Sequence, residues 1–204
     1  MHNKEHWEHV YTSKATDAVS WFQAHATLSL DLIESTGMGR DAALIDVGGG
    51  ASTLMDDLLD RGYTNLSTLD LSGAALAASQ ARLGKKAASV RWLEADITTA
   101  DLPVHAYDIW HDRAVFHFLT DPVQRQAYVN AVLRAVKPRG HVIVATFAED
   151  GPTQCSGLPV MRYSATQLHA AFGSPFELIR HEEETHATPF GTQQRFVYCH
   201  FRKI

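Results

Sequence analysis

The apolar positions of this chain follow two patterns that alternate from about residue 44 onward. Short runs of apolar, often β-branched residues suit strands buried in a parallel sheet. Between them, apolar residues recur every three or four positions, as on one face of a helix. We expect strands over residues 44–47, 65–72, 89–97, 107–110, 141–147, 176–186 and 193–203. We expect helices over residues 15–35, 51–62, 73–84, 123–137 and 165–173.

Local signals mark where several of these elements begin and end. Ser72 and Ser164 stand where a side-chain oxygen would accept the first free N–H groups of a helix. Pro122 follows Asp121 at the first position of another helix, where proline is favoured. Residues 187–192 (ATPFGT) form a Pro/Gly hairpin loop, so we expect the last two strands to pair antiparallel.

The order of the elements predicts the fold class. Strands that alternate with helices through short links give right-handed crossovers and a parallel sheet. We therefore expect an α/β fold with a Rossmann-like, seven-stranded, mostly parallel sheet, helices on both faces and a C-terminal antiparallel hairpin. Neither a repeat nor a linker divides the sequence, so we predict a single domain over residues 1–204.

A glycine turn and two acidic residues suggest a ligand site in this fold. Gly48, Gly49 and Gly50 lie between the first strand and its helix, where a ligand can approach bare backbone. Asp70 ends the second strand, where a carboxylate would bond a ribose diol, and Asp96 ends the third. Because the carboxyl ends of parallel strands share one edge of the sheet, these residues predict a nucleotide-like site.

The glycine turn departs from the dinucleotide-binding fingerprint. That motif needs a third glycine where this chain has Thr53. Asp46, two residues before the first glycine, would suit an ammonium better than a pyrophosphate. The pattern Asp-x-Gly-x-Gly that begins at Asp46, with Asp70 and Asp96 after it, resembles the class I S-adenosylmethionine-dependent methyltransferases. The motifs extend over about residues 43–147, and the order of elements is similar to the C-terminus.

The resemblance implies S-adenosylmethionine as the cofactor and S-adenosylhomocysteine as its product. It implies that the glycine turn lies against the amino acid part of the cofactor. Asp70, with Leu71, would hold the ribose, and Asp96 with Ile97 would contact adenine. The backbone near His111 would meet the amino group of the cofactor.

The N-terminal segment carries aromatic residues at helical spacing. Trp7 and Tyr11 lie on one helical face, and Trp21 follows ten residues later. In similar family members such a segment folds over the cofactor as a lid that excludes water from the sulfonium, and Tyr11 and Trp21 would contact the cofactor. Alternatively, Trp7 and Trp21 pack a helix against the sheet edge. The predicted parts are a lid and helix segment (1–40), a cofactor core (41–147), and an acceptor loop with hairpin (148–204).

Polar residues follow the fourth predicted strand. The resemblance places Asp112 near the methyl donor, as a candidate catalytic residue. His117 is the candidate general base because its unperturbed pKa lies near neutrality, and the alternative is that it fills a packing gap. Arg113 would pair with an acid or orient an anionic acceptor.

Residues 149–164 form a long loop where the family builds its acceptor pocket. In this loop, Arg162 would clamp a carboxylate and Tyr163 would orient a hydroxyl. Cys155 has no evident activating partner, so we expect it in the pocket wall. The spacing of cysteines, histidines and acids predicts no metal site.

Composition narrows the classes of partner. The formal net charge is −5 and no long Lys/Arg run is present, which disfavours nucleic acid as a partner. No apolar stretch approaches the ~20 residues that a membrane span needs. Two cysteines do not make a disulfide framework. We expect a cytoplasmic protein without a nucleic acid or membrane partner, and the oligomeric state stays open.

The resemblance implies in-line methyl transfer, and we expect a small-molecule acceptor. The sequence does not say whether O, N or S is methylated. The Asn-Pro-Pro-Tyr element of relatives that methylate amides or adenine N6 is absent. Protein lysine methylation is an alternative with the same chemistry. An NAD-linked oxidoreductase and a non-catalytic nucleotide-binding module are alternatives of another class, and a non-catalytic partner subunit is a third.

Overall fold

Seven strands built from the apolar runs form one sheet in a computed structural model that describes residues 4–204. Their order is β3-β2-β1-β4-β5-β9-β8. The first five are parallel, β9 is antiparallel to β5, and β8 is antiparallel to β9, so the predicted fold class is confirmed. The strands are β1 (Leu44–Val47), β2 (Leu66–Asp70), β3 (Val90–Glu94), β4 (Tyr107–Arg113), β5 (Val136–Phe147), β8 (Phe176–Ala187) and β9 (Gln193–Lys203). A small separate pair consists of β6 (Gln154–Cys155) and β7 (Leu158–Pro159).

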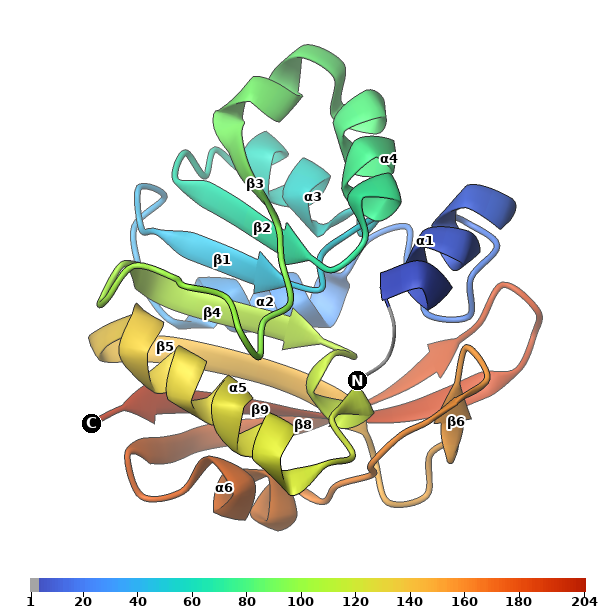
Figure 1. Cartoon of the computed structure of the whole chain (residues 1–204). Coiled ribbons are helices and arrows are strands. Elements are labelled where there is room, and N and C mark those ends of the chain that lie inside the picture. Colours follow the sequence, from blue (N-terminus) through green and yellow to red (C-terminus); the bar gives the residue numbers. More distant parts are fainter. Residues whose placement is uncertain (1–3) are drawn as a thin grey trace.

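Helices cover both faces of this sheet (Figure 1). On one face lie α2 (Thr27–Ser35) and α3 (Leu54–Asp60), and on the other lie α5 (Pro122–Ala135) and α6 (Ala165–Phe172). Helix α4 (Gly73–Leu83) follows β2, and α1 (Lys4–Ser13) lies beside it. Two short 3₁₀ turns, η1 (Gly84–Ser89) and η2 (Phe116–Phe118), complete the described elements.

The predicted helix starts are confirmed at three places. The Ser72 hydroxyl accepts the N–H of Ala75 at 3.1 Å. Ser164 and Gln167 form a reciprocal capping box at the start of α6. Asp121 accepts the N–H of Val123 at 2.8 Å, with proline next at the first helical position.

The core divides into two layers because successive strand residues face opposite sides of the sheet. Ile45 and Trp110 pack toward α5, together with the buried Tyr128. Leu44 and Ile109 pack on the other side, toward α2 and α3. The side chains of successive residues in one strand therefore lie on opposite faces of the sheet, and this alternation places the site residues of β1 and β4.

The helix predicted over residues 15–35 is wrong in its first half, because α2 begins only at Thr27. The backbone carbonyls just before it bond to distant segments instead of to a helix ladder. Ser20 O contacts His186 Nε2 at 2.9 Å, Trp21 O accepts from Arg113 at 3.0 Å, and Gln23 O accepts from Thr53 at 2.9 Å. We call residues 20–25 the strap.

Strand β4 runs three residues beyond the predicted end at Trp110. Its last residues pair in register with both neighbouring strands, for example His111 with Asp46 of β1 and Arg113 with Ala145 of β5. His111 and Asp112 therefore lie inside the sheet and not beyond its edge. None of the helices in residues 4–204 is long and apolar enough to cross a membrane.

Candidate functional site

Two adjoining cavities lie at the carboxyl ends of β1, β2 and β4. The larger holds about 870 Å³ and the smaller about 550 Å³, with the open space at their mouths included. Both are lined by Tyr11, Trp21, Gly48 and Arg113. Because they share these residues, the two cavities together make up the candidate site, which lies beside the glycine turn and α1.

The glycine turn fits closely against its neighbours. Gly48 has a φ of +71°, and a Cβ there would lie 1.9 Å from Val115 Cγ2. At Gly49 a Cβ would lie 2.3 Å from Asp46 Oδ2. At Gly50 a Cβ would lie 2.5 Å from the Oδ2 atom of Asp70. The close approach of two carboxylates to bare backbone therefore requires glycine at these positions.

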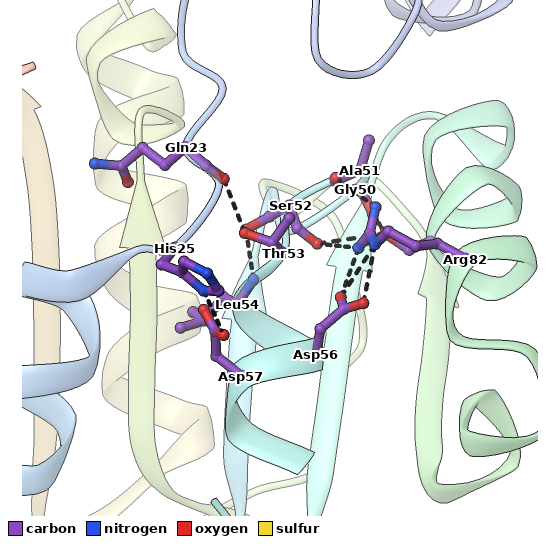
Figure 2. Close-up of polar contacts among 11 residues, drawn as sticks. Gln23, His25, Gly50, Ala51, Ser52, Thr53, Leu54, Asp56, Asp57 and Arg82 are labelled. Carbon is purple, nitrogen blue, oxygen red and sulfur yellow. Dashed lines mark hydrogen bonds and ion pairs between the residues drawn. The ribbon is translucent and has the colours of Figure 1, made fainter. Parts of the chain in front are cut away.

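Helix α4 supports the far side of this turn (Figure 2). Arg82 donates to the carbonyls of Ala51 at 3.0 Å and Ser52 at 2.6 Å, and it forms an ion pair with Asp56 at 2.7 Å. Ser79 donates to the carbonyl of Gly50 at 2.6 Å. These bonds tie the turn to α3 and α4 and fix its backbone.

The strap supports the near side. Thr53 donates to the carbonyl of Gln23, and His25 Nδ1 lies 2.8 Å from Asp57 Oδ1 (Figure 2). The Gln23 side chain reaches the other way and donates to Glu184 of β8 at 2.8 Å. The strap thus connects the glycine turn to the C-terminal hairpin.

Asp70 and Asp96 line the larger cavity together with Leu71 and Ile97. Asp70 accepts the N–H of Ser72 at 2.8 Å. Burial raises the pKa of Asp70 to about 7. Asp96 accepts the N–H and hydroxyl of Thr98 through Oδ1.

Asp46 and His111 line the smaller cavity. Asp46 Oδ1 lies 2.7 Å from His111 Nδ1, and both side chains are buried. His111 Nε2 lies 2.9 Å from the hydroxyl of Ser29 in α2. Asp46 Oδ2 has no hydrogen-bond partner among the described residues. The structure thus brings together the three predicted acids and the glycine turn around one site.

Four aromatic side chains border the larger cavity from above the turn: Trp7, Tyr11, Trp21 and Phe118. The ring of Trp7 meets those of Trp21 and Phe118 edge to face, at centroid distances of 5.8 and 5.1 Å. Trp21 Nε1 donates to the Tyr11 hydroxyl at 3.2 Å. The aromatic N-terminal segment therefore lies at the cavity.

Helix α1 is fastened at its outer side. The Glu8 carboxylate accepts the N–H of Gly73 at 2.6 Å and of Ala74 at 3.2 Å, at the N-terminus of α4, where a negative charge is favourable. Lys4 forms an ion pair with Glu94 at the end of β3. These contacts hold Trp7 and Tyr11 against the cavity.

Asp112 and His117 do not reach either cavity, which argues against both predicted catalytic roles. Asp112 points to the α5 face and accepts the N–H groups of Val115 and Phe116 and the hydroxyl of Tyr128, at 2.9, 3.1 and 2.5 Å. The His117 ring is fully buried and packs on the rings of Phe118 and Phe147. The alternative in which His117 fills a packing gap agrees better with this position.

The side chain of Arg113 lines both cavities, but its charge is used within the protein. Arg113 Nε donates to the Tyr198 hydroxyl at 2.8 Å, and Nη2 lies 3.4 Å from Glu184 Oε2. Of the two roles expected for Arg113, pairing with an acid is the one that its contacts support. Cys155 lies in the wall of the larger cavity, and burial raises the pKa of its thiol to about 12.

Arg162 and Tyr163 lie outside both cavities. Arg162 is exposed and donates to the carbonyl of Gly151 at 3.3 Å. Tyr163 is buried in the α5 layer, with its ring 5.7 Å from that of Phe116. Their predicted contacts with an acceptor therefore have no support from these positions.

Several cavity residues were missed by the sequence reasoning. Val115 and Phe118 come shortly after β4, and a correct prediction of the end of that strand would have placed them at the site. Nothing in the sequence around Thr98 and Gln124 indicates that they line the cavity. The contact of Ser29 with His111 joins residues 82 positions apart and could not be read from local spacing.

The carboxylate acceptors and the glycine turn of this site fit a cationic nucleoside ligand. A buried carboxylate oxygen without a partner at Asp46 suits an ammonium, a second carboxylate at Asp70 suits a diol, and the turn leaves no room for side chains. Within residues 4–204 there is no group of three or more His, Cys, Asp or Glu side chains placed to hold a metal ion.

Comparison with known proteins agrees with this geometry. Residues 44–140 match a family model described as a methyltransferase domain. The chain is 24% identical over 191 residues to the EEF1A lysine methyltransferase 2 of Danio rerio, covering 87% of this chain and 76% of that protein.

Solved structures of similar fold cover nearly the whole chain. A structure from work on the conversion of a disulfide bond into a thioacetal group during echinomycin biosynthesis superposes with a TM-score of 0.80 at 16% identity, over 98% of this chain and 92% of that one. The N-methyltransferase NodS of Bradyrhizobium japonicum, in complex with S-adenosylhomocysteine, superposes with a TM-score of 0.67 at 14% identity, over 87% and 84% of the two chains.

Proposed function

We propose that the chain is a class I S-adenosylmethionine-dependent methyltransferase, which transfers the methyl group to a small-molecule acceptor by in-line displacement. The match of residues 44–140 to a methyltransferase domain supports this proposal. The bound cofactor supplies a methyl group on a positively charged sulfur. The chain aligns the acceptor with that carbon and keeps water away, so positioning dominates the rate enhancement.

In this proposal, different cavity residues bind different parts of the cofactor. Asp46 and the glycine turn would hold the amino acid part, and Asp70 would bond the ribose hydroxyls. Asp96 and Ile97 would contact adenine. The aromatic residues of α1 and the strap would cover the sulfonium and exclude water.

The observation that supports this proposal most strongly is the convergence of acids from three strands at one glycine turn. Asp46 lines the smaller cavity, Asp70 and Asp96 line the larger one, and Gly48 lies in both linings. Neither Asp112 nor His117 is assigned proton removal, because neither lines a cavity. An acceptor that already carries an available lone pair, such as a thiolate or a neutral amine, would need no such base.

Protein lysine methylation is the second candidate, and the similarity to the zebrafish lysine methyltransferase favours it. A lysine accepts a methyl group only as a neutral amine, so its ammonium must first lose a proton to solvent. The residue chemistry at the cavity is the same for both candidates, so the size of the acceptor decides between them.

The test is a labelling experiment with methyl-labelled S-adenosylmethionine and a cell extract. We expect label in the low-mass fraction after ultrafiltration, and much less label with the Asp70→Ala variant at a cofactor concentration near the Kd of the unaltered protein. Label in protein alone would favour lysine methylation. Binding of NADH without binding of S-adenosylhomocysteine, measured by isothermal titration, would overturn the methyltransferase proposal.

A further inference from the structure

Three buried polar residues form a hydrogen-bonded chain behind the smaller cavity. The Ser29 hydroxyl lies 2.9 Å from His111 Nε2, and His111 Nδ1 lies 2.7 Å from Asp46 Oδ1. The relative exposures are 0% for Ser29 and 2% for both His111 and Asp46. We call this set the Ser29–His111–Asp46 relay.

The fold places these residues together for a simple reason. Asp46 and His111 are in-register partners on the parallel strands β1 and β4, so their side chains leave the sheet on the same face. Helix α2 covers that face, and Ser29 lies on its buried side beside Leu30 and Ile33. The relay therefore joins two strands of the sheet to the helix that follows the strap.

With Asp46 ionised and His111 neutral, one arrangement of the protons satisfies both hydrogen bonds. An ionised carboxylate only accepts, so His111 Nδ1 carries a proton and donates it to Asp46. In the neutral imidazole, Nε2 then accepts the proton of the Ser29 hydroxyl. Both ring nitrogens are used, and the rotamer of Asp46 is fixed.

The second oxygen of Asp46 remains for a ligand. Asp46 Oδ2 and the neighbouring Thr68 Oγ1 have no partners among the described residues, and both lie within 2.4 Å of the position that a Cβ of Gly49 would occupy. Because Asp46 also lines the smaller cavity, its oxygen without a donor attracts a group that brings several N–H donors. A primary ammonium has three.

We propose that Ser29 and His111 are positioning residues, which hold Asp46 so that its Oδ2 receives the α-ammonium of the cofactor's amino acid part. This inference rests on the proposed function. The relay acts on one end of the ligand only, because Asp70 and Asp96 lie in the other cavity. It does not act as a nucleophilic triad, since Ser29 lines neither cavity and is fully buried.

The test compares two ligands that differ at the amino acid end. S-adenosylhomocysteine carries the α-ammonium, and 5′-methylthioadenosine has the same nucleoside without it. We expect His111→Met to lower the affinity for S-adenosylhomocysteine by at least about tenfold and the affinity for 5′-methylthioadenosine by less than about twofold, measured by isothermal titration. Retained binding of the second ligand shows that the variant is folded.

Two further variants separate positioning from packing. His111→Asn keeps a donor near the place of Nδ1, so it restores much of the affinity for S-adenosylhomocysteine. Ser29→Ala removes only the hydrogen bond to His111 Nε2 and lowers the affinity for S-adenosylhomocysteine by about threefold. The matched control Asp70→Asn weakens both ligands, because both have the ribose.

If His111→Met lowers the affinity for both ligands equally, or for neither, the positioning role of the relay is overturned. Lack of rescue by His111→Asn would reduce the histidine to a packing role. If the unaltered protein binds neither ligand, the proposed function itself fails, and that outcome is distinct from the others.

Discussion

At the residue scale, Asp70 is the carboxylate whose ionisation should control cofactor binding. Burial raises its pKa to about 7, with smaller contributions from the nearby Asp46 and Glu8, while the N–H groups of Ser72 and Leu71 act in the opposite direction. A ribose diol donates hydrogen bonds to the ionised form, so a proton competes with the ligand.

We therefore predict that the affinity for S-adenosylhomocysteine falls by about fivefold to tenfold between pH 8 and pH 6. Asp70→Asn should flatten this profile and lower the affinity at pH 8 by about tenfold. Isothermal titration at several pH values measures both effects. A profile that is unchanged in the variant would remove Asp70 from the ribose site.

Asp112 should act on stability and not on turnover. Burial raises its pKa to about 7, although hydrogen bonds from Tyr128 and two main-chain N–H groups oppose that shift. Because the pKa is raised on folding, the contribution of this group to stability is full below pH ~4 and is lost as the pH rises through about 7.

Asp112→Ala should lower the free energy of unfolding by about 3 kcal/mol, because two buried donors and one half-buried donor lose their acceptor. The melting temperature should fall by about 6–12 °C, while turnover at 15 °C stays within about threefold. Loss of turnover at an unchanged melting temperature would return Asp112 to a catalytic role.

The acids of the site could be predicted from the sequence at this scale, whereas the neighbours of β4 could not. Asp46, Asp70 and Asp96 are marked by strand ends and a glycine turn. His111 and Asp112 point to opposite faces of the sheet only because they are successive residues of one strand. The three polar residues 111–113 gave no sign that the strand continues through them.

At the element scale, α1 is held over the cavity by Glu8 at the N-terminus of α4. Glu8→Ala removes this fastening, and we predict that S-adenosylhomocysteine dissociates about fivefold to tenfold faster. Stopped-flow fluorescence follows the change, because Trp7 and Trp21 line the cavity. The control His9→Ala changes an exposed residue of the same helix, and equal rates in both variants would contradict the prediction.

Helix α4 also supports the glycine turn through Arg82 (Figure 2). Arg82→Met loses the bonds to two carbonyls and to Asp56, so the turn loosens and the affinity for S-adenosylhomocysteine should fall about tenfold. Equilibrium dialysis measures the affinity. Arg91→Met, at an exposed position of β3, is the matched control and should bind normally.

Elements with capping residues were predictable, and the strap was not. Ser72, Asp121 and Ser164 mark their helices in the sequence, and each forms the expected bond. Residues 15–26 have helical spacing, but long-range hydrogen bonds to β4, β8 and Thr53 take up their carbonyls. Local periodicity contains no information on such partners.

At the scale of the whole molecule, ligand binding should stabilise the folded state as a unit. S-adenosylhomocysteine at about one hundred times its Kd should add about 2.7 kcal/mol to the free energy of unfolding. The melting temperature should then rise by about 5–10 °C, measured by scanning fluorimetry. An equal rise with NADH would contradict the specificity of the site.

The class of fold followed from the alternation of strands and helices, and the C-terminal hairpin followed from its turn residues. The acceptor side did not follow in the same way, because Arg162 and Tyr163 lie outside the cavities while Trp7 and Phe118 line them. In the proposed function, acceptor contacts depend on how α1 and the strap meet η2, which lies far from both in sequence.

The fastening of α1 has a kinetic consequence. Under the proposed function, a ligand that leaves the larger cavity past α1 would break the contacts of Glu8 and Lys4, which would re-form in every catalytic cycle. Escape of the spent cofactor would then be slower than the chemical step. The first turnover of a rapid-mixing experiment should accordingly appear as a burst, followed by a slower steady rate.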